Sequence, residues 1–401
     1  MKKAISFLTM LILLLCIASS GTAEKPFRTE GIDIPVFTDM KKFDLPDTDA
    51  MAFSGNLRAG WNLGNTFDAY NGTKFIPGTS TETSWVGVWT STELIDTIFE
   101  AGFNLIRIPV SWHNHVDANW QIDAEWMARV EEVVRYALGK GMYVILNIHH
   151  DNDIRFFYPL KQYLESSKNY LSSIWKQIGE HFADCDEHLI LESMNEPRLV
   201  GDVNLEWTWS PTNTTSLEAL DCINQFNQLF VDTIRSCGGQ NTSRYLLIPG
   251  YAGNPYSVCS DQFVIPQDPT PDHIMIEVHA YTPYSFALSE DMNDSHFDLD
   301  HDKSAIGSFM NDLYKKFISN GIPVIIDEFG ARDKNGNLQD RVNFAAYYIV
   351  SASARGIPCC WWDNHCFDGN GERFGIIDRK SCTWVYPDIA LAILSNCDYN
   401  R

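Results

Sequence analysis

The chain has 401 residues, of which 45% are hydrophobic and 20% charged, and its formal net charge at pH 7 is −22. That length fits one large α/β barrel or two ordinary domains. An acidic surface repels phosphate backbones, so we expect no nucleic acid partner and instead a neutral polymer or a small uncharged ligand.

Residues 1–23 contain two lysines, a short apolar run and small residues at the end. This pattern predicts a secretory signal peptide cleaved after Ala23, because no stop-transfer pattern follows. A lipoprotein signal centred on Cys16 fits less well, since "LLLC" lacks small residues before the cysteine. Loss of Lys2 and Lys3 would change the net charge from −22 to −24. We expect a secreted protein, extracellular or periplasmic, without a membrane partner.

Residues 24–52 contain three prolines and are interpreted as an N-terminal lead-in. Eight apolar, strand-like runs then alternate with helix-like stretches such as 91–102 and 123–141, both of which end in glycine as helices often do. Such alternation indicates a parallel sheet covered on both faces. Eight units predict a (β/α)₈ TIM barrel that occupies residues 53–401 as a single catalytic domain. The strands are expected to begin near Leu57, Phe103, Met142, His188, Tyr245, His273, Ile322 and Ile357.

Most of these strands are apolar at first and carry a polar or aromatic residue at the carboxyl end. In a barrel these ends meet at one rim, where active sites are built. An open doubly wound sheet is disfavoured, because no glycine-rich phosphate loop follows the first strand. The rim residues are Asn65, Arg107, His149, Glu196, His279, Glu328 and Trp362.

Nine cysteines would remain after removal of Cys16, and an odd count leaves at least one free thiol or an intermolecular bridge. Cys222 with Cys237, and Cys366 with Cys382, are candidate disulfides by proximity in the sequence. No pair of cysteines and no Cys/His cluster has zinc spacing, so we expect neither a metal nor a cofactor.

Two glutamates stand out at strand ends, Glu196 in "MNEPR" and Glu328 in "IDEFG". Glycosidic cleavage needs one carboxyl group to protonate the leaving oxygen and a second carboxylate at the sugar carbon. The acid needs a raised pKa, whereas the nucleophile must stay ionised, which Arg107 could ensure. Because strand side chains alternate, His279 and Tyr281 should point the same way, while Asp327 should face away from Glu328.

The chain resembles glycoside hydrolase family 5, in the branch of endo-β-1,4-glucanases and xyloglucanases. The resemblance covers roughly residues 55–395 and rests on seven motifs in the same order. They are "GWNLGNTFDAY" (60–70), "IRIPVSW" (106–112), "ILNIHHD" (145–151), "MNEPR" (194–198), "VHAYTPY" (278–284), "IDEFG" (326–330) and "WWDN" (361–364).

This resemblance implies that Glu196 is the general acid/base and Glu328 the nucleophile of a retaining mechanism. It also implies that Asn195 hydrogen bonds the sugar 2-hydroxyl and that Arg107 and Tyr281 orient Glu328. In the same way, His149 and His279 would line the subsite at the cleavage point, and Trp362 would form its floor.

Several of these residues have an alternative interpretation as metal ligands, packing residues or turn residues. His149, His150 and Asp151 could form a metal site, although adjacent strand residues diverge and no HExxH motif is present. Trp361 and Trp362 should face opposite ways, with one of them buried. Asn65 and Asp68 could form a turn or contact a sugar. Loop aromatics offer outer sugar subsites, of which two or three are expected to be used: Trp85, Trp89, Trp112, Trp207, Trp209 and Tyr284.

These observations predict a monomeric, secreted endo-β-1,4-glucanase, or cellulase, that acts on cellulose, mixed-linkage β-glucan or xyloglucan. Long loops after the first and fourth strands favour an open cleft and internal cleavage. The alternatives are a mannanase or xylanase on the same fold, a non-catalytic glycan-binding protein, and a metal-dependent esterase.

Overall fold

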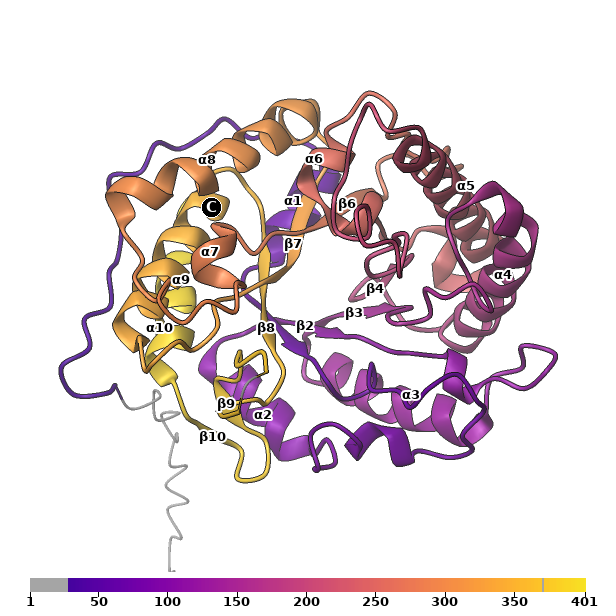
Figure 1. The fold of residues 1–401 in the computed structure, drawn as a ribbon, viewed down its shortest axis with the longest axis horizontal. Coiled ribbons are helices and arrows are strands. Elements are labelled where there is room, and N and C mark those ends of the chain that lie inside the picture. The colour runs from indigo at the N-terminus through magenta and orange to yellow at the C-terminus, as the bar shows by residue number, and fades with distance from the viewer. Residues whose placement is uncertain (1–27, 370) are drawn as a thin grey trace, which may run out of the picture.

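The computed structural model describes residues 28–369 and 371–401, so the predicted signal peptide lies outside the described residues. Eight parallel strands follow one another in chain order around a closed barrel, and β8 pairs with β1 (Figure 1). This confirms the predicted (β/α)₈ TIM barrel. The strands are β1 (Gly60–Leu63), β2 (Leu105–Ile108), β3 (Tyr143–Asn147), β4 (Leu189–Glu192), β5 (Leu246–Ile248), β6 (Ile274–His279), β7 (Val324–Phe329) and β8 (Cys359–Asp363).

Helices surround the barrel, and the connection after β5 is the shortest, with a single helical turn, α6, in place of a full helix. The helices are α1 (Asp49–Asn56), α2 (Thr92–Ala101), α3 (Ala124–Gly139), α4 (Leu164–His181), α5 (Thr214–Ser236), α6 (Pro255–Val258), α7 (Tyr284–Ala287), α8 (Leu299–Lys316), α9 (Leu338–Ser353) and α10 (Pro387–Asn396). Short 3₁₀ helices are η1 (Ser80–Thr83), η2 (His113–His115), η3 (Lys161–Tyr163), η4 (Gly239–Thr242), η5 (Tyr251–Gly253) and η6 (Ile318–Asn320), and β9 (Ile377–Asp378) pairs with β10 (Thr383–Trp384).

Sequence-encoded caps explain where the first outer helices begin and end. The Ser91 hydroxyl accepts from the N–H of Leu94 at the start of α2, and the Asp123 carboxylate accepts from two N–H groups at the start of α3. Gly102 ends α2 with a φ of 115°, in the left-handed region that favours glycine. The helices predicted at 91–102 and 123–141 are therefore present with nearly the predicted bounds.

From residue 28 onward, the lead-in wraps around the outside of the barrel and then closes its amino-terminal end. Its indigo trace runs past α10, α9 and α8 before it reaches α1 (Figure 1). The N–H of Phe37 donates to Asn396 on α10, and that of Asp33 donates to Gln339 on α9. Phe53 of α1 then stacks on Tyr245 beneath the strands, with ring centroids 3.6 Å apart. The predicted lead-in, residues 24–52, thus ends inside α1.

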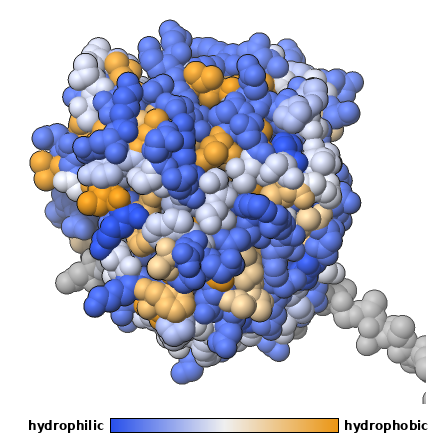
Figure 2. Space-filling model, turned by 90° about the vertical axis from the view of Figure 1, so that its right-hand side faces the viewer, coloured by the Kyte–Doolittle hydropathy of each residue, from blue (hydrophilic) through white to orange (hydrophobic). Residues whose placement is uncertain are grey.

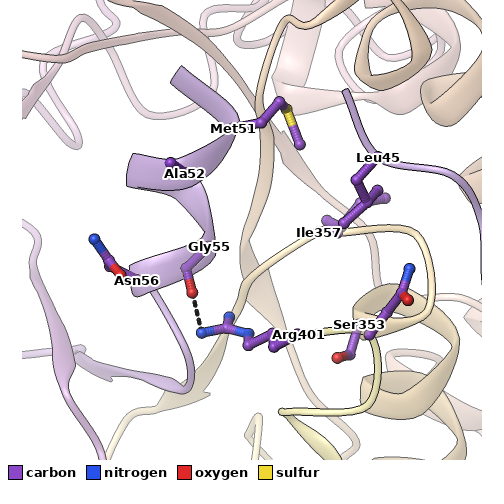
Figure 3. A pocket seen from close by; sticks show the side chains of 10 residues that line it. Leu45, Met51, Ala52, Gly55, Asn56, Ser353, Ile357 and Arg401 are labelled. Carbon is purple, nitrogen blue, oxygen red and sulfur yellow. Dashed lines mark hydrogen bonds between the residues drawn. The ribbon is translucent and has the colours of Figure 1, made fainter. Parts of the chain in front are cut away.

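A pocket of about 300 Å³ lies beside α1 at this closed end. Figure 3 shows Arg401 reaching toward the end of α1, where its guanidinium donates to the carbonyl of Gly55. A second bond, 2.7 Å long, joins Arg401 to the carbonyl of Leu57. The carboxyl-terminal residue therefore ties α1 to the rest of the barrel.

The barrel interior changes from apolar to polar along six of the eight strands, with β5 and β8 as the exceptions. Its floor packs against Ala50, Phe53 and Leu57, and consists of Leu105, Ile145, Ile190, Leu247, Met275, Ile325 and Cys360. Two residues further along the strands, on the same interior face, lie buried polar side chains that we call the polar layer. The polar layer consists of Asn62, Arg107, Asn147, Glu192, Glu277 and Asp327.

Gly60 is required where β1 meets β8. A Cβ atom at this position would lie 2.2 Å from Sγ of Cys360, so a side chain would force the two strands apart. We expect Gly60→Ala to lower the free energy of unfolding by about 1–3 kcal/mol. Chemical denaturation measures this, and the double variant Gly60→Ala/Cys360→Ala should regain at least half of the loss. Full additivity of the two substitutions would contradict this contact.

All nine cysteines of the described residues are unpaired, so the two predicted disulfides are wrong. Cys222 lies within α5 and Cys237 caps the end of the same helix, and a straight helix keeps their side chains far apart. Cys366 and Cys382 are also free, and Sγ of Cys382 lies 3.7 Å from Oγ of Ser91 instead.

The outer surface is predominantly hydrophilic on the side that carries α4 and α5, where apolar residues occur only in scattered groups (Figure 2). Among the described residues, no helix combines the length and the hydrophobicity needed to cross a membrane.

Candidate active site

Glu196 and Glu328 meet at the carboxyl-terminal rim of the barrel, in a cleft of about 920 Å³. One carboxylate oxygen of each lies within 4.8 Å of the other and of a ring nitrogen of His279. Retaining glycosidases hold their two carboxyl groups about 5–5.5 Å apart, whereas inverting enzymes separate them by about 6.5–9.5 Å. The spacing observed here matches the retaining arrangement.

Backbone hydrogen bonds to the neighbouring loops fix Glu196 beyond the end of β4. The N–H of Asn195 donates to the carbonyl of Ile148 after β3, and the carbonyl of Pro197 accepts from Ala252 after β5. Proline at 197 ends the extended run, so the chain turns at the rim. The glutamate is thereby presented to the cleft by a segment held on both sides.

A β-bulge in β7 determines the direction in which the Glu328 side chain points. Ile326 pairs with Cys359 of β8, but Phe329 pairs with Trp361, so β7 carries one extra residue in this interval. Asp327 and Glu328 consequently both turn inward, and each contacts Arg107. The prediction that Asp327 faces away from Glu328 is wrong, because strict alternation fails at a bulge.

Arg107 is the central cation of the site and is fully buried. Its Nη1 donates to Oε1 of Glu328 at 2.6 Å, and its Nη2 donates to Oδ1 of Asn195 at 2.7 Å. Two further bonds, of 2.6 and 2.7 Å, join it to both carboxylate oxygens of Glu192. Such a bidentate pair fixes the guanidinium plane. Arg107 therefore holds Glu328 in place through a charge-assisted hydrogen bond.

His279 and Tyr281 point the same way from the end of β6, as predicted. Nδ1 of His279 lies 2.8 Å from Oε1 of Glu196 and 3.4 Å from Oε2 of Glu328. The Tyr281 hydroxyl donates to Oε2 of Glu328 at 3.0 Å. Both oxygens of Glu328 thus have a donor, and His279 bridges the two carboxylates.

The charges of this cluster decide where its proton resides. Burial alone would lower the pKa of His279, but Glu328 and Glu196 raise this pKa to about 9. Burial would raise the pKa of Glu196, but the hydrogen bond and positive charge of His279 outweigh it and lower this pKa. The expected raised pKa of the acid is therefore not found in the substrate-free protein, because His279 carries the proton.

Asn195, His149 and Trp362 line the cleft beside the two glutamates. Because Oδ1 of Asn195 accepts from Arg107, its amide N–H groups remain available to a sugar hydroxyl. The ring of His149 is parallel to that of Trp362, with centroids 5.8 Å apart. Burial lowers the pKa of His149 well below its ordinary value, so this imidazole is neutral.

Trp361 and Trp362 face opposite ways, as predicted. Trp361 is fully buried, and its Nε1 donates to the carbonyl of Phe374 at 3.2 Å. Trp362 lines the cleft. Gly64 lies under its ring, because a Cβ there would be 2.8 Å from two ring atoms. The contact leaves no space for a side chain at position 64.

Asn65 and Asp68 do not line the cleft. Both carboxylate oxygens of Asp68 accept backbone hydrogen bonds, from Asn65 at 3.0 Å and from Thr66 at 2.7 Å. Asn65 has a φ of 58°, which is typical of such a turn. The structure therefore favours the turn interpretation for both residues.

His149 and His150 lie closer together than the alternation argument predicted. Their ring centroids are 4.4 Å apart, because β3 ends at Asn147 and neither residue is in the strand. Donor atoms of both rings and of Asp68 lie within 4.8 Å of one another. Asp151, by contrast, accepts from Tyr170 and pairs with His113, so it supports the loop instead of joining this group.

The loop aromatics divide into cleft and packing residues. Trp207 and Tyr284 line the cleft and are 59% and 66% exposed. Trp112 is fully buried, and its Nε1 donates to the carbonyl of Asn147, so this member of the set is a packing residue. Trp85, Trp89 and Trp209 lie outside the lining of this cleft.

Sequence reasoning missed the acids of the polar layer, Glu192 and Glu277. Glu192 lies two residues after Ile190 of the floor, and Glu277 lies two after Met275. A period of two along each strand, counted from the apolar floor, could have placed both inside the barrel.

Paired carboxylates on a barrel rim, with an arginine behind one and a histidine between them, define the site of a glycoside hydrolase. The chain belongs to glycosyl hydrolase family 5, because the Cellulase family model matches residues 68–368.

Relatives and solved structures agree with this assignment. Endoglucanase A of Ruminococcus albus is 40% identical over 358 residues, which cover 88% of this chain and 94% of that protein. A mutant glycoside hydrolase 5 lichenase from Caldicellulosiruptor sp. F32, in complex with cellotetraose, is 48% identical with a TM-score of 0.88, covering 91% of this chain and 100% of the other. A broad-specificity endoglucanase from Ruminococcus champanellensis with bound cellotriose is 40% identical, with a TM-score of 0.80 and coverage of 88% and 100%.

Proposed function

We propose that this protein is a retaining endo-β-1,4-glucanase that cleaves cellulose, mixed-linkage β-glucan or xyloglucan by double displacement. The observation that carries this proposal is the approach of Glu196 and Glu328 to within 4.8 Å across an open cleft. The relatives support it, since they include endoglucanases and a lichenase with bound cello-oligosaccharides.

In the first step Glu328 attacks the anomeric carbon, and the bond to the leaving oxygen breaks. Arg107 and Tyr281 hold the carboxylate in position through one hydrogen bond to each oxygen until the attack. The leaving oxygen takes a proton from Glu196, which receives it from Nδ1 of His279 across the 2.8 Å hydrogen bond. Negative charge on Glu328 is consumed as the ester forms, so no buried charge is created.

In the second step water displaces Glu328 from the sugar. Glu196, now ionised, accepts the proton of the attacking water and returns it to Nδ1 of His279, and Glu328 regains its charge beside Arg107. Two displacements at one carbon return the product to the configuration of the substrate. The roles of Glu196 in the two steps are the reverse of each other, as microscopic reversibility requires.

The sugar at the cleavage point would lie on Trp362, whose ring forms one wall beside His149. Sugar rings present C–H faces that stack on aromatic rings. Asn195 would donate to the 2-hydroxyl, an interaction that strengthens in the transition state. These contacts recognise an equatorial 2-hydroxyl, which glucans have and mannans lack, and this favours the glucanase assignment over a mannanase.

Trp207 would extend the cleft on the leaving-group side. Arg198 lies over one face of its ring at 3.8 Å and approaches Oε2 of Glu196 at 3.6 Å. The opposite ring face is free to stack on a sugar beyond the cleaved bond. An open cleft with aromatic surfaces beyond the two carboxylates suits internal cleavage of a polymer.

We expect Trp207→Ala to lower kcat/KM on β-glucan about 3- to 10-fold, the loss of one stacking contact of about 0.5–1.5 kcal/mol. An aryl cellobioside has no sugar on the leaving-group side, so its hydrolysis should be unchanged. Trp89→Ala is the matched control, because Trp89 is 50% exposed and lies outside the cleft lining. Equal losses on both substrates would contradict this placement of Trp207.

A time course of products from barley glucan, xyloglucan, carboxymethylcellulose, xylan and mannan tests the proposal. We expect a mixture of oligosaccharides to appear early from the glucans, with a rapid fall in viscosity. Cleavage of mannan or xylan alone would reject the glucanase assignment in favour of these alternatives. Binding without release of reducing sugar would instead identify a glycan-binding protein, and loss of activity with a chelator would point to a metal-dependent enzyme.

We also propose that the protein is secreted and monomeric. Secretion is inferred from the pattern of residues 1–23, and the strongly negative charge suits an enzyme that meets neutral polymers. Analysis of the culture medium and of the mature amino-terminus tests secretion, and size-exclusion chromatography with light scattering tests the monomer.

A further inference from the structure

Two carboxyl groups of the polar layer have no role in the proposed reaction and no hydrogen-bond donor among the residues that the structure describes. Glu277 on β6 and Asp327 on β7 are both fully buried. No donor from the described part of the chain bonds any of their four carboxyl oxygens. One oxygen of each lies within 4.8 Å of the other, beside Glu192 and His279. Buried carboxylates without donors are costly, so this pair requires an explanation.

Charge balance shows that these two groups cannot both be ionised. Glu192 has two bonds from Arg107 and one from Asn147, and Glu328 has Arg107 and Tyr281. Glu192 and Glu328 are therefore already paired with the single positive charge of Arg107. Two adjacent carboxyl groups in a low-dielectric site then share one proton, as like charges at close range disfavour double ionisation.

The directions of the pKa shifts agree with this geometry. Burial, followed by the charges of Asp327 and Glu192, raises the pKa of Glu277 well above its ordinary value. Burial and the charge of Glu192 raise the pKa of Asp327 to about 7. Above about pH 7 the pair therefore carries a single negative charge, with the proton on Glu277, and below it the pair becomes neutral.

The negative charge of the pair faces Nε2 of the His279 ring. Nε2 of His279 lies 3.5 Å from Oδ1 of Asp327 and 3.8 Å from Oε2 of Glu277. It also lies 3.5 Å from Nη2 of Arg107. With the pair anionic, Nε2 keeps its proton and faces Asp327. With the pair neutral, Nε2 would face Arg107 without this counter-charge, and the pKa of His279 would be lower.

We propose that Glu277 and Asp327 share one proton and form a buried anionic pair that keeps His279 protonated and oriented between Glu196 and Glu328. Both are positioning residues, since they act through His279 and touch no substrate. The proposal rests on the proposed roles of Glu196 and Glu328 for its effect on activity, but the protonation of the pair is independent of them.

Several other titratable or charged groups face the pair. Burial raises the pKa of the thiols of Cys359 and Cys360 well above the ordinary value, so both stay neutral. Arg107 lies 3.5 Å from Asp327 through Nε. These groups are, by strand, Arg107 from β2, Glu192 from β4, His279 from β6, Glu328 from β7, and Cys359 and Cys360 from β8.

Two nearly isosteric substitutions separate charge from packing. Asp327→Asn removes the carboxylate and leaves a neutral Glu277, so the pKa of His279 should fall by about one unit or more. Glu277→Gln supplies an amide donor to Asp327, which then stays ionised, so the pKa of His279 should remain near that of the wild type. The pKa of His279 is measured by NMR of labelled histidine, and the alkaline limb of the kcat/KM profile should move to lower pH in Asp327→Asn alone.

Infrared spectroscopy of the full-length protein tests the shared proton directly. The carbonyl stretch of a buried protonated carboxyl group should be present in mildly alkaline buffer. It should disappear in Glu277→Gln and persist in Glu82→Gln, whose carboxylate is buried elsewhere and paired with Arg129. This measurement remains decisive even if Asp327→Asn does not fold.

The proposal would be overturned by the absence of this band in the wild type or by its persistence in Glu277→Gln. Equal shifts of the His279 pKa in both variants would also overturn it, as would a stoichiometric metal ion that both variants lose. Because the infrared and NMR measurements use no substrate, their failure is distinguishable from a failure of the proposed hydrolysis.

Discussion

Glu328→Ala is expected to lower kcat on β-glucan by a factor on the order of 10⁴–10⁶, the scale on which loss of a catalytic nucleophile acts. The fold should survive, because Arg107 keeps both bonds to Glu192 when Glu328 is removed. Initial rates of reducing-sugar release measure the loss, and thermal unfolding reports the stability. Added azide should restore part of the turnover and give an α-glycosyl azide, since a small anion fits the space that the carboxylate vacates.

Glu82→Gln is the matched control for this variant. Glu82 is also buried and paired with an arginine, Arg129, but it lies outside the cleft. Its substitution should affect stability and leave kcat near that of the wild type. A Glu328→Ala enzyme with wild-type rates, or one rescued to a β-glycosyl product, would reject the nucleophile assignment.

Glu196→Ala should discriminate sharply between substrates. A natural glucan has a poor leaving group that needs a proton, so its hydrolysis should fall by about 10²–10⁴-fold. An aryl glycoside with an acidic phenol needs little protonation, so formation of its glycosyl-enzyme should be nearly unaffected, and an early burst of phenol is expected. Stopped-flow absorbance measures the burst, and steady-state rates on both substrates give the ratio.

In the Glu196→Ala variant, His279 loses its partner for proton transfer but keeps its contact with Glu328. Removal of Glu196 leaves His279 paired with Glu328 at 3.4 Å, so the protonated imidazole keeps one carboxylate partner. If both substrates lost activity equally, the general acid role would be wrong, and Glu196 would instead be a residue that binds the sugar.

The sequence predicts the barrel and its rim because the strands begin with apolar residues and end in polar or ionisable side chains. Glu196, Glu328, Arg107 and His279 are each the polar end of an apolar run, and in a parallel barrel all such ends converge. Their mutual contacts follow from that convergence. The seven ordered motifs then add the roles that the chemistry alone would leave open.

Departures from regular strands explain most of the errors. A bulge in β7 turns Asp327 inward beside Glu328, and the early end of β3 lets His149 and His150 converge. Neither irregularity leaves a local signal, because a bulge depends on the register of two partner strands. The burial of Trp112 also depends on its neighbours, since its indole donates to the backbone of β3.

The polar layer could be predicted only in part. The two-residue period along β4 and β6 places Glu192 and Glu277 inside the barrel. It does not reveal that Arg107 donates hydrogen bonds to Glu192 and Glu328 and none to Glu277. Whether a buried acid is paired depends on side chains from several strands. That information exists only once the ring is closed.

The anomeric configuration of the first-formed product tests the two-carboxylate reaction most directly. When the protein cleaves a soluble β-1,4-glucan in an NMR tube, we predict that new reducing ends appear first as the β-anomer. The α-anomer should then grow in at the rate of spontaneous mutarotation. Reducing ends that appear first as the α-anomer would show a single displacement and contradict a covalent intermediate on Glu328.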